Sequence, residues 1–114
     1  MRLGTYRFGR IDIEGQPYRA DVIVTPKGVV EAWWRGRSHT VAVDDLTEII
    51  ATRPDILVVG TGYFGRMVVS DDARRHLQAH EIELREARTP QAVAEFNRLQ
   101  ARHARIAAAL HLTC

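Results

Sequence analysis

Apolar and charged residues alternate near the start of the chain, as they do in strands with one wet face. Residues 10–14 follow this period of two, and residues 18–24 continue it after a turn at Gly15-Gln16-Pro17. A second turn at residues 26–28 leads to residues 29–34. The pattern predicts three strands joined by short turns, which favour antiparallel neighbours.

Helical and extended patterns alternate after these hairpins. Asp45 and Glu48 form a capping-box pair before an apolar stripe, so we expect a short helix that Arg53-Pro54 ends. The uncharged residues 56–59 predict a strand covered on both faces. Residues 67–69 predict a further short extended segment.

Capping signals mark two more helices. Ser70 is a suitable N-cap for a helix that runs to about residue 80, and residues 82–84 predict a strand after it. Pro90 fits the first position of another helix. The expected buried face of that helix carries Ala92, Phe96 and Leu99.

The tail, residues 106–112, is ambiguous. Its alanines favour a helix, whereas its alternating larger apolar residues favour a strand. Hairpins followed by alternating strands and helices favour a layered α/β or α+β architecture, and we expect residues 1–114 to form a single domain.

The composition is that of an ordinary globular protein, with 46% hydrophobic and 26% charged residues. No apolar run approaches the ~20 residues of a membrane span, and the charged start does not resemble a signal peptide. Cys114 is the only cysteine, which fits a reducing compartment. We therefore expect a cytoplasmic protein without a membrane segment.

Arginine dominates the basic residues, since Lys27 is the only lysine among 16 Lys and Arg. Arginine suits phosphate and carboxylate recognition, but together with the many alanines it also fits a GC-rich genome, and both explanations stay open. The arginines form no basic run, and the formal net charge is only +2. The sequence therefore gives no specific indication of nucleic-acid binding.

A G-x-G-x-x-G motif at residues 60–65 follows the predicted buried strand. A dinucleotide site needs a helix that begins at these glycines, so that its free amides meet the pyrophosphate. The next helix signal, Ser70, lies eight residues beyond Gly62. We therefore expect a structural turn, in which the glycines allow a tight exit from the strand.

A ligand site at this turn is the alternative. The amides of Gly60, Thr61 and Gly62 would hold a small ligand or anion, and Arg66 would supply positive charge. Ligands of open α/β sheets gather at the carboxyl ends of strands, where this turn is expected to lie.

Trp33 and Trp34 are adjacent, so in a strand they point to opposite faces. The strand period places Trp34 on the buried side and Trp33 on the exposed side. An exposed Trp33 beside Arg35 and Arg37 has the residue types of an interface anchor. His39 follows in a polar loop. It is either a hydrogen-bonded loop residue, an acid–base group or ligand contact, or part of the same partner surface.

No catalytic set stands out in the sequence. His76 and His80 have a spacing that suits a metal ion, but no third ligand lies near them. His111 and Cys114 fall on opposite faces of a strand, or on a frayed terminus, so we expect no activated thiolate. We expect no cofactor and no metal, and the sequence favours a protein that is not an enzyme.

Several segments nevertheless occur in a distinctive order. They are Trp34-Arg35, His39, Asp44-Asp45, the strand and turn from Asp55 to Gly62, Met67-Val68-Val69, Thr89-Pro90 with Phe96-Asn97, and His111-Leu112-Thr113-Cys114. In this order and spacing, over nearly the whole chain, the sequence resembles the Mth-938-like domain family, whose function is unknown. Its relatives include an adipogenesis-associated protein and, more distantly, a mitochondrial complex I assembly factor.

The resemblance implies an α/β fold, a three-layer domain with a mixed central β-sheet and N-terminal β-hairpins, and a strand in the tail. It supplies no catalytic residues. The chain departs from the family pattern at two places. His80-Glu81 ends a helix where a glycine is expected, and Ala32 stands where some relatives carry a second tryptophan, which opens space beside Trp34.

Three hypotheses of function follow. The first is a non-catalytic binding or assembly module with a protein partner, which contacts Trp33, Arg35, Arg37 and His39. The second is a small-ligand protein, or a cryptic enzyme, that uses the Gly60-Thr61-Gly62 turn. The third is nonspecific nucleic-acid binding through the arginines. The sequence leaves homo-oligomer formation open.

Overall fold

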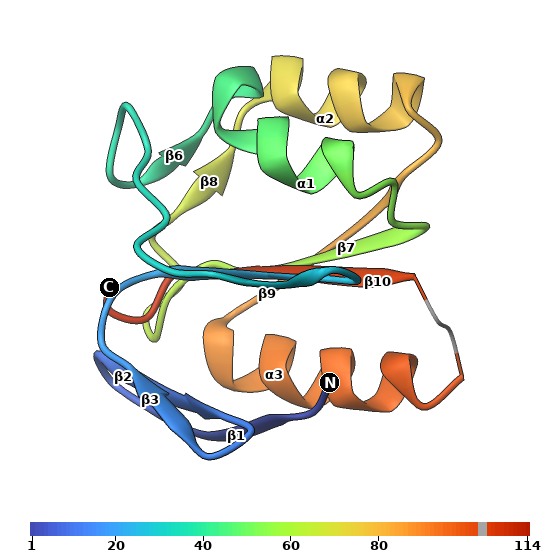
Figure 1. The fold of residues 1–114 in the computed structure, drawn as a ribbon. Coiled ribbons are helices and arrows are strands. Elements are labelled where there is room, and N and C mark those ends of the chain that lie inside the picture. Colours follow the sequence, from blue (N-terminus) through green and yellow to red (C-terminus); the bar gives the residue numbers. More distant parts are fainter. Residues whose placement is uncertain (103–104) are drawn as a thin grey trace.

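A mixed five-stranded sheet forms the middle of the structure, and other elements cover both of its faces (Figure 1). The computed structural model describes residues 1–102 and 105–114. In order across the sheet, the strands are β5 (Gly28–Val30), β4 (Val22–Thr25), β10 (Ile106–Leu110), β7 (Ile56–Gly60) and β9 (Glu83–Ala87). β10, β7 and β9 run parallel to one another, whereas β4 is antiparallel to β10.

Helices and short strands form the two outer layers (Figure 1). One face carries α1 (Thr47–Ala51), α2 (Asp71–Ala79), the short 3-10 helix η1 (Val43–Leu46), and the pair β6 (Thr40–Val41) and β8 (Val68–Val69). The other carries α3 (Thr89–Gln100) and a sheet of β1 (Leu3–Arg7), β2 (Arg10–Ile13) and β3 (Gln16–Tyr18). This confirms the predicted three-layer α/β fold. No helix in the described residues has the length and apolar character needed to cross a membrane.

Strand β10 lies at the centre of both cores. Ile106, Ala108 and Leu110 pack with α3, whereas Ala107 and Ala109 pack with α1 and α2. All five side chains are buried. Pairing with β7 on one side and β4 on the other overrides the helical preference of the alanines, and their small size lets both outer layers approach the sheet. The strand expected in the tail is therefore confirmed.

The capping signals of the second half are also confirmed. Ser70 Oγ accepts a hydrogen bond from the Ala73 N–H at 3.1 Å, so Ser70 is the N-cap of α2. Pro90 lies in the first turn of α3. The buried residues of α3 include Ala92, Phe96 and Leu99, as predicted.

The N-terminal half is divided more finely than predicted. Residues 18–24, expected to form one strand, contain the end of β3 and most of β4, which belong to different sheets. The separation lets one hairpin system cover α3 while β4 joins the central sheet (Figure 1). β1, which pairs antiparallel with β2, was not expected from the sequence.

The predicted capping box at Asp45 is wrong in its partner. The Asp45 carboxylate accepts the Ala42 N–H at 2.8 Å and closes η1, rather than pairing with Glu48. The reason is that the helical segment begins at Val43 as a 3-10 turn, three residues before the expected start.

The two tryptophans lie opposite to the prediction. Trp33 is 6% exposed and packs in the core beneath α1 and α2, whereas Trp34 is 83% exposed. The cause is Ala32, whose φ of 55° lies in the left-handed region and breaks the alternation after β5 ends at Val30. The strand expected at residues 29–34 is therefore shorter, and each indole takes the other face.

Helix α2 ends in a Schellman motif without glycine. The Glu81 N–H donates to the Gln78 carbonyl and the Ile82 N–H to the Leu77 carbonyl, each at 3.0 Å. Glu81 has a φ of 59°, the conformation that glycine usually supplies at this position. Although His80-Glu81 departs from the family pattern, the helix ends with the usual hydrogen bonds. Glu81 takes a strained backbone conformation to make them.

Replacing Glu81 by glycine should therefore stabilise the protein. A non-glycine residue in this conformation costs about 1–2 kcal/mol, part of which is offset because glycine gains more entropy in the unfolded chain. We expect Glu81→Gly to raise the free energy of unfolding in urea by about 0.5–1 kcal/mol. The control is Glu83→Gly in strand β9, which should lower stability. Equal losses in both variants would contradict the strain at Glu81.

Candidate functional site

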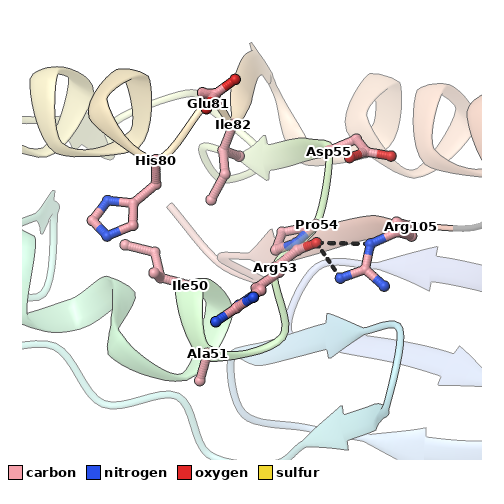
Figure 2. Close-up of a pocket in the computed structure, with 9 residues that line it drawn as sticks. All are labelled: Ile50, Ala51, Arg53, Pro54, Asp55, His80, Glu81, Ile82 and Arg105. Carbon is pink, nitrogen blue, oxygen red and sulfur yellow. Dashed lines mark hydrogen bonds between the residues drawn. The ribbon is translucent and has the colours of Figure 1, made fainter.

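One hollow lies at the amino end of the parallel strands, beside α1 and the end of α2 (Figure 2). It has a volume of about 740 Å³. Arg105, one of its lining residues, donates from Nε to the Arg53 carbonyl at 2.9 Å and from Nη2 to the Thr52 carbonyl at 2.8 Å. This guanidinium therefore closes the turn after α1.

His76 and His80 lie near the same end of the sheet. Their rings pack edge to face with centroids 4.6 Å apart, and His80 Nδ1 lies 2.9 Å from the His76 carbonyl oxygen. Within residues 1–102 and 105–114, no group of three or more His, Cys, Asp and Glu residues is placed to hold a metal.

The Gly60-Thr61-Gly62 turn uses its amides within the fold. The Thr61 N–H donates to the Ala87 carbonyl, and the Gly62 N–H donates to Thr89 Oγ1, each at 2.9 Å. The buried Thr89 hydroxyl then donates to the His111 carbonyl at 2.6 Å. Because these two amides already have acceptors, neither of them is free for the anion of the alternative hypothesis.

The same turn is closely packed. Gly62 has a φ of 106°, and a Cβ atom there would lie 2.2 Å from the carbonyl carbon of Cys114. Arg66 is exposed, and its backbone N–H donates to the Cys114 carbonyl at 3.1 Å. After the turn the next helix begins only at Asp71, so the geometry of a dinucleotide fingerprint is absent, as expected.

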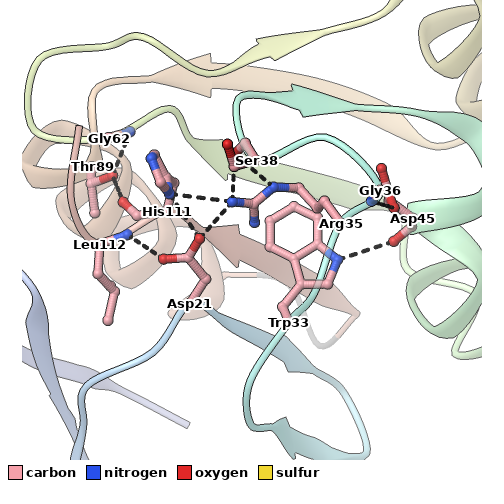
Figure 3. A network of polar contacts seen from close by, with 10 residues as sticks. All are labelled: Asp21, Trp33, Arg35, Gly36, Ser38, Asp45, Gly62, Thr89, His111 and Leu112. Atoms are coloured by element: carbon pink, nitrogen blue, oxygen red, sulfur yellow. Dashed lines mark hydrogen bonds and ion pairs between the residues drawn. The ribbon is translucent and has the colours of Figure 1, made fainter.

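Asp21 organises a buried polar network at the carboxyl end of the parallel strands (Figure 3). It precedes β4, which is antiparallel to β10, and so lies beside the residues that follow β10. Its Oδ1 accepts the Leu112 N–H at 2.8 Å. Its Oδ2 accepts from His111 Nδ1 and from Arg35 Nη2, each at 2.7 Å. One carboxylate thus joins the start of β4, the loop after β5 and the end of β10.

The surroundings of Asp21 favour its ionised form. Burial acts to raise the pKa of the carboxyl, because the charge loses hydration. Hydrogen bonds from His111, from the Leu112 N–H and from Arg35 act in the opposite direction and together outweigh burial. The pKa of Asp21 is therefore below its ordinary value, and the group is a carboxylate at neutral pH.

Arg35 is charged and buried, with a side chain only 4% exposed. Its Nη2 and Nε also donate to the Ser38 carbonyl, at 2.7 and 3.2 Å. Its guanidinium lies 4.5 Å from the centroid of the Trp33 ring, whose Nε1 is fixed by the Asp45 carbonyl (Figure 3). Arg35 Nη1 has no hydrogen-bond partner among the described residues. A buried donor without a hydrogen bond costs about 1–3 kcal/mol of free energy, so an acceptor that bonded to Nη1 would be favourable.

His111 is held in one tautomer. Its 2.7 Å contact with the Asp21 carboxylate requires a proton on Nδ1. The 3.4 Å contact between Nδ1 and Arg35 Nη2 therefore joins two donors and is not a hydrogen bond. Nε2, which points away from Asp21 in Figure 3, is buried and has no partner among the described residues. The exposed His39 ring packs edge to face on His111, with centroids 5.4 Å apart.

The network borders a cavity of about 330 Å³, which we call the tryptophan pocket. Its lining residues are Arg19, Ala20, Asp21, Ala32, Trp33, Trp34, Arg35, Ser38 and His111. Ala32 and Trp34 are both among them, in agreement with the space expected beside Trp34. Apolar and aromatic walls around a few fixed polar groups are typical of small-molecule sites.

Nearly the whole sequence matches a family without an assigned activity. The family described as "Protein of unknown function (DUF498/DUF598)" matches residues 3–111. The chain belongs to this family.

Solved structures with the DUF498/DUF598 fold agree with this assignment. A conserved hypothetical protein, PH1505 from Pyrococcus horikoshii, is 26% identical with a TM-score of 0.89, and the match covers 100% of both chains. MT938 is 24% identical with a TM-score of 0.83, over 99% of this chain and 98% of that one. A Bordetella pertussis protein, a structural genomics target described as a Mth938-like domain, is 20% identical with a TM-score of 0.78, over 97% and 85% of the two chains. The Mth-938-like resemblance is confirmed.

In this DUF498/DUF598 protein, two of the four residues predicted to form a partner surface are buried and the other two are exposed. Trp33 and Arg35 are buried in the network, so the prediction that they are exposed interface anchors is wrong. The buried ion pair with Asp21 and the inverted indoles are the physical reason. Arg37 and His39 are exposed, and the exposed indole near them is Trp34.

The contact between Asp21 and His111 was not predicted from the sequence. The available signal was a carboxylate directly before the apolar strand β4 and a histidine directly after the fully buried strand β10. Charged and polar groups next to buried strands need partners. The two residues are 90 positions apart, so no local spacing connects them.

The Asp21 carboxylate should make stability depend on pH. A folded-state pKa below the unfolded value of 3.8 adds stability above that value, and this contribution is lost as the pH falls through the folded pKa. Asp21→Asn should unfold about 3 kcal/mol more easily at neutral pH, because Arg35 loses its buried counter-charge.

In urea denaturation experiments, the difference in the free energy of unfolding between Asp21→Asn and wild type should shrink as the pH falls below 3.8. Asp44→Asn, at an exposed position, is the matched control and should stay close to wild type. A gap between Asp21→Asn and wild type that keeps its size at acid pH would contradict the role given to this carboxylate.

Proposed function

We propose that this protein is a non-catalytic binding module, and that the tryptophan pocket binds a small carboxylate with a flat apolar body. The observation that supports this most strongly is the pair of buried nitrogens, Arg35 Nη1 and His111 Nε2, left without partners among the described residues and carried by side chains that line the pocket. An incoming acceptor would remove the cost of the unpaired Arg35 donor.

The charges around the pocket favour an anion. Asp21 balances the charge of Arg35, and Arg19, an exposed lining residue, forms no ion pair within the described part of the chain. One carboxylate oxygen would accept from Arg35 Nη1, because Nη2 and Nε of the same side chain already donate to Asp21 and to the Ser38 carbonyl.

The remaining lining favours an apolar body on the ligand. Ala20, Ala32 and the two indoles supply mostly apolar surface, and the volume of about 330 Å³ is at the small end of ligand sites. Trp34 is 83% exposed, so a flat ligand beside it would bury much of an indole that the fold itself leaves in water.

The surroundings of the Asp21–His111 pair favour binding over catalysis, because the pair has no group to activate among the described residues. An aspartate that orients a histidine is the arrangement of a general base. Among the described residues, however, His111 Nε2 contacts no hydroxyl or thiol that it would activate. The charge cluster therefore supports recognition of an acid. The lone cysteine supports our further proposal that the protein works in the cytoplasm.

The test is a binding assay with an acid and its amide. Phenylacetate should raise the melting temperature of the protein and shift the NMR signals of the indole N–H groups, whereas the isosteric phenylacetamide should do neither. At one hundred times its dissociation constant, the acid should add about 2.7 kcal/mol to the free energy of unfolding.

Variants at exposed positions of the pocket should weaken this binding without unfolding the protein. We expect Trp34→Ala and Arg19→Gln each to lower the affinity for phenylacetate about tenfold, or about 1.4 kcal/mol. Arg37→Gln is the matched control, since Arg37 is exposed but does not line the pocket. Equal binding of acid and amide, or full affinity in Trp34→Ala, would refute the proposal.

A further inference from the structure

Three exposed aromatic side chains meet on the surface, and none of them lines the tryptophan pocket. Phe8, from the turn after β1, contacts Tyr63 and Phe64, from the glycine turn after β7, with ring centroids 6.1 and 6.3 Å away. Tyr63 and Phe64 are 5.1 Å apart. The three residues, which we call the aromatic cluster, are 54%, 46% and 58% exposed in the order of the chain.

Packing in the fold does not account for this exposure. Single exposed apolar residues are normal on protein surfaces, but contiguous apolar patches mark interaction sites. Phe8 is far from Tyr63 and Phe64 in sequence, and two separate turns bring their rings together, so the patch exists only in the folded protein. Phenylalanine and tyrosine are also enriched at protein interfaces.

The tail of the chain fixes the cluster in place. The Gly9 N–H donates to the Leu112 carbonyl at 2.8 Å, and the Tyr63 N–H donates to the Thr113 carbonyl at 2.6 Å. The Tyr6 hydroxyl donates to the same Leu112 carbonyl at 2.8 Å. Because both turns are already ordered, a partner would lose little conformational entropy in binding them.

Three arginines neighbour the cluster, two of them in sequence and one in space. Arg7 precedes Phe8, and Arg66 follows Phe64 by two residues. Arg88 lies against the same turn, since a Cβ atom on Gly65 would be 3.3 Å from its Cγ. All three arginines are exposed, and none forms an ion pair with the described residues. Their charge favours a partner that carries acidic groups.

Two other occupants fit less well. A second copy of the chain would bring the same arginines together across a symmetric contact, which repels. A nucleic acid stacks its bases on flat, accessible ring faces. The rings of the cluster instead meet at interplanar angles of 59°, 71° and 78°, so they form a notched apolar surface rather than a platform.

We propose that the aromatic cluster and its arginines dock a protein segment in which an apolar anchor side chain is flanked by aspartate or glutamate. The anchor fills the space between the tilted rings, and the acidic residues pair with Arg7, Arg66 and Arg88. This surface shares no residue with the tryptophan pocket. A test of this docking surface therefore does not depend on whether the tryptophan pocket binds a carboxylate.

A peptide library displayed on phage tests the proposal directly. Random 12-residue peptides are selected on the wild-type protein and depleted on the Phe8→Ser/Phe64→Ser double variant. We expect the surviving peptides to share an aromatic or leucine residue next to acidic residues. No enrichment over the double variant, or enriched peptides without acidic residues, would overturn the proposal.

Fluorescence anisotropy with the best peptide then locates its site. Phe64→Ser and Phe8→Ser should each weaken binding at least tenfold, and Arg88→Gln should weaken it several-fold while reducing its dependence on salt. Trp34→Ala is the matched control, an exposed aromatic outside the cluster, and should bind as wild type does. Melting temperatures close to wild type establish that the variants fold.

Two further outcomes would replace the proposal with another. A dT12 oligonucleotide that binds wild type but not Phe64→Ser, where the peptides do not, would make the surface a nucleic-acid site. A dimer in analytical ultracentrifugation that Phe64→Ser dissociates would make it a contact between copies of the chain.

Discussion

The hydrogen bonds to the Asp21 carboxylate hold together parts of the chain that nothing local connects. Arg35 lies 14 positions from Asp21, and His111 and Leu112 lie 90 and 91 positions from it. Burial of a carboxylate is costly, and three donors converge on this one to offset that cost. Removing any donor leaves charge or polarity unpaired in the interior, so the contacts depend on one another.

This constraint also sets the geometry of both proposed sites. By binding Leu112 and His111, Asp21 fixes the direction in which the chain leaves β10. The tail then supplies the carbonyl groups that order the turns of the aromatic cluster. On the other side of the carboxylate, Arg35 draws the loop after β5 inward over Trp33 and leaves Trp34 in solvent. The pocket and the docking surface are thus two consequences of one buried charge cluster.

The sequence predicted those parts of the fold that local chemistry decides. The uncharged strand β7, the Ser70 cap and the position of Pro90 depend on a few neighbouring residues, and each lies where it was expected. The sequence also predicted that no helix begins at the glycine turn, because the start of a helix depends on neighbouring residues. The family resemblance supplied the three-layer arrangement and the strand in the tail, where alanine propensity alone was ambiguous.

The candidate site was less predictable, because its contacts are not local. A single residue with a left-handed backbone conformation, Ala32, exchanged the faces of the two indoles. The alternation of apolar and polar residues does not indicate where such a conformation interrupts a strand. His111 was considered beside Cys114, its neighbour in sequence, whereas its partner in the fold is Asp21. The sequence located the tryptophan–arginine segment as important but assigned its buried residues to the surface.

The protonation of the His111 ring tests the central claim most directly. A long-range ¹H–¹⁵N NMR spectrum of the histidine side chains at neutral pH reports which ring nitrogen carries a proton. The account predicts a proton on His111 Nδ1 that exchanges slowly with water, and its loss of protection in Asp21→Asn. A His111 ring protonated at Nε2 alone would show that Asp21 does not hold it, and would contradict the network on which both sites depend.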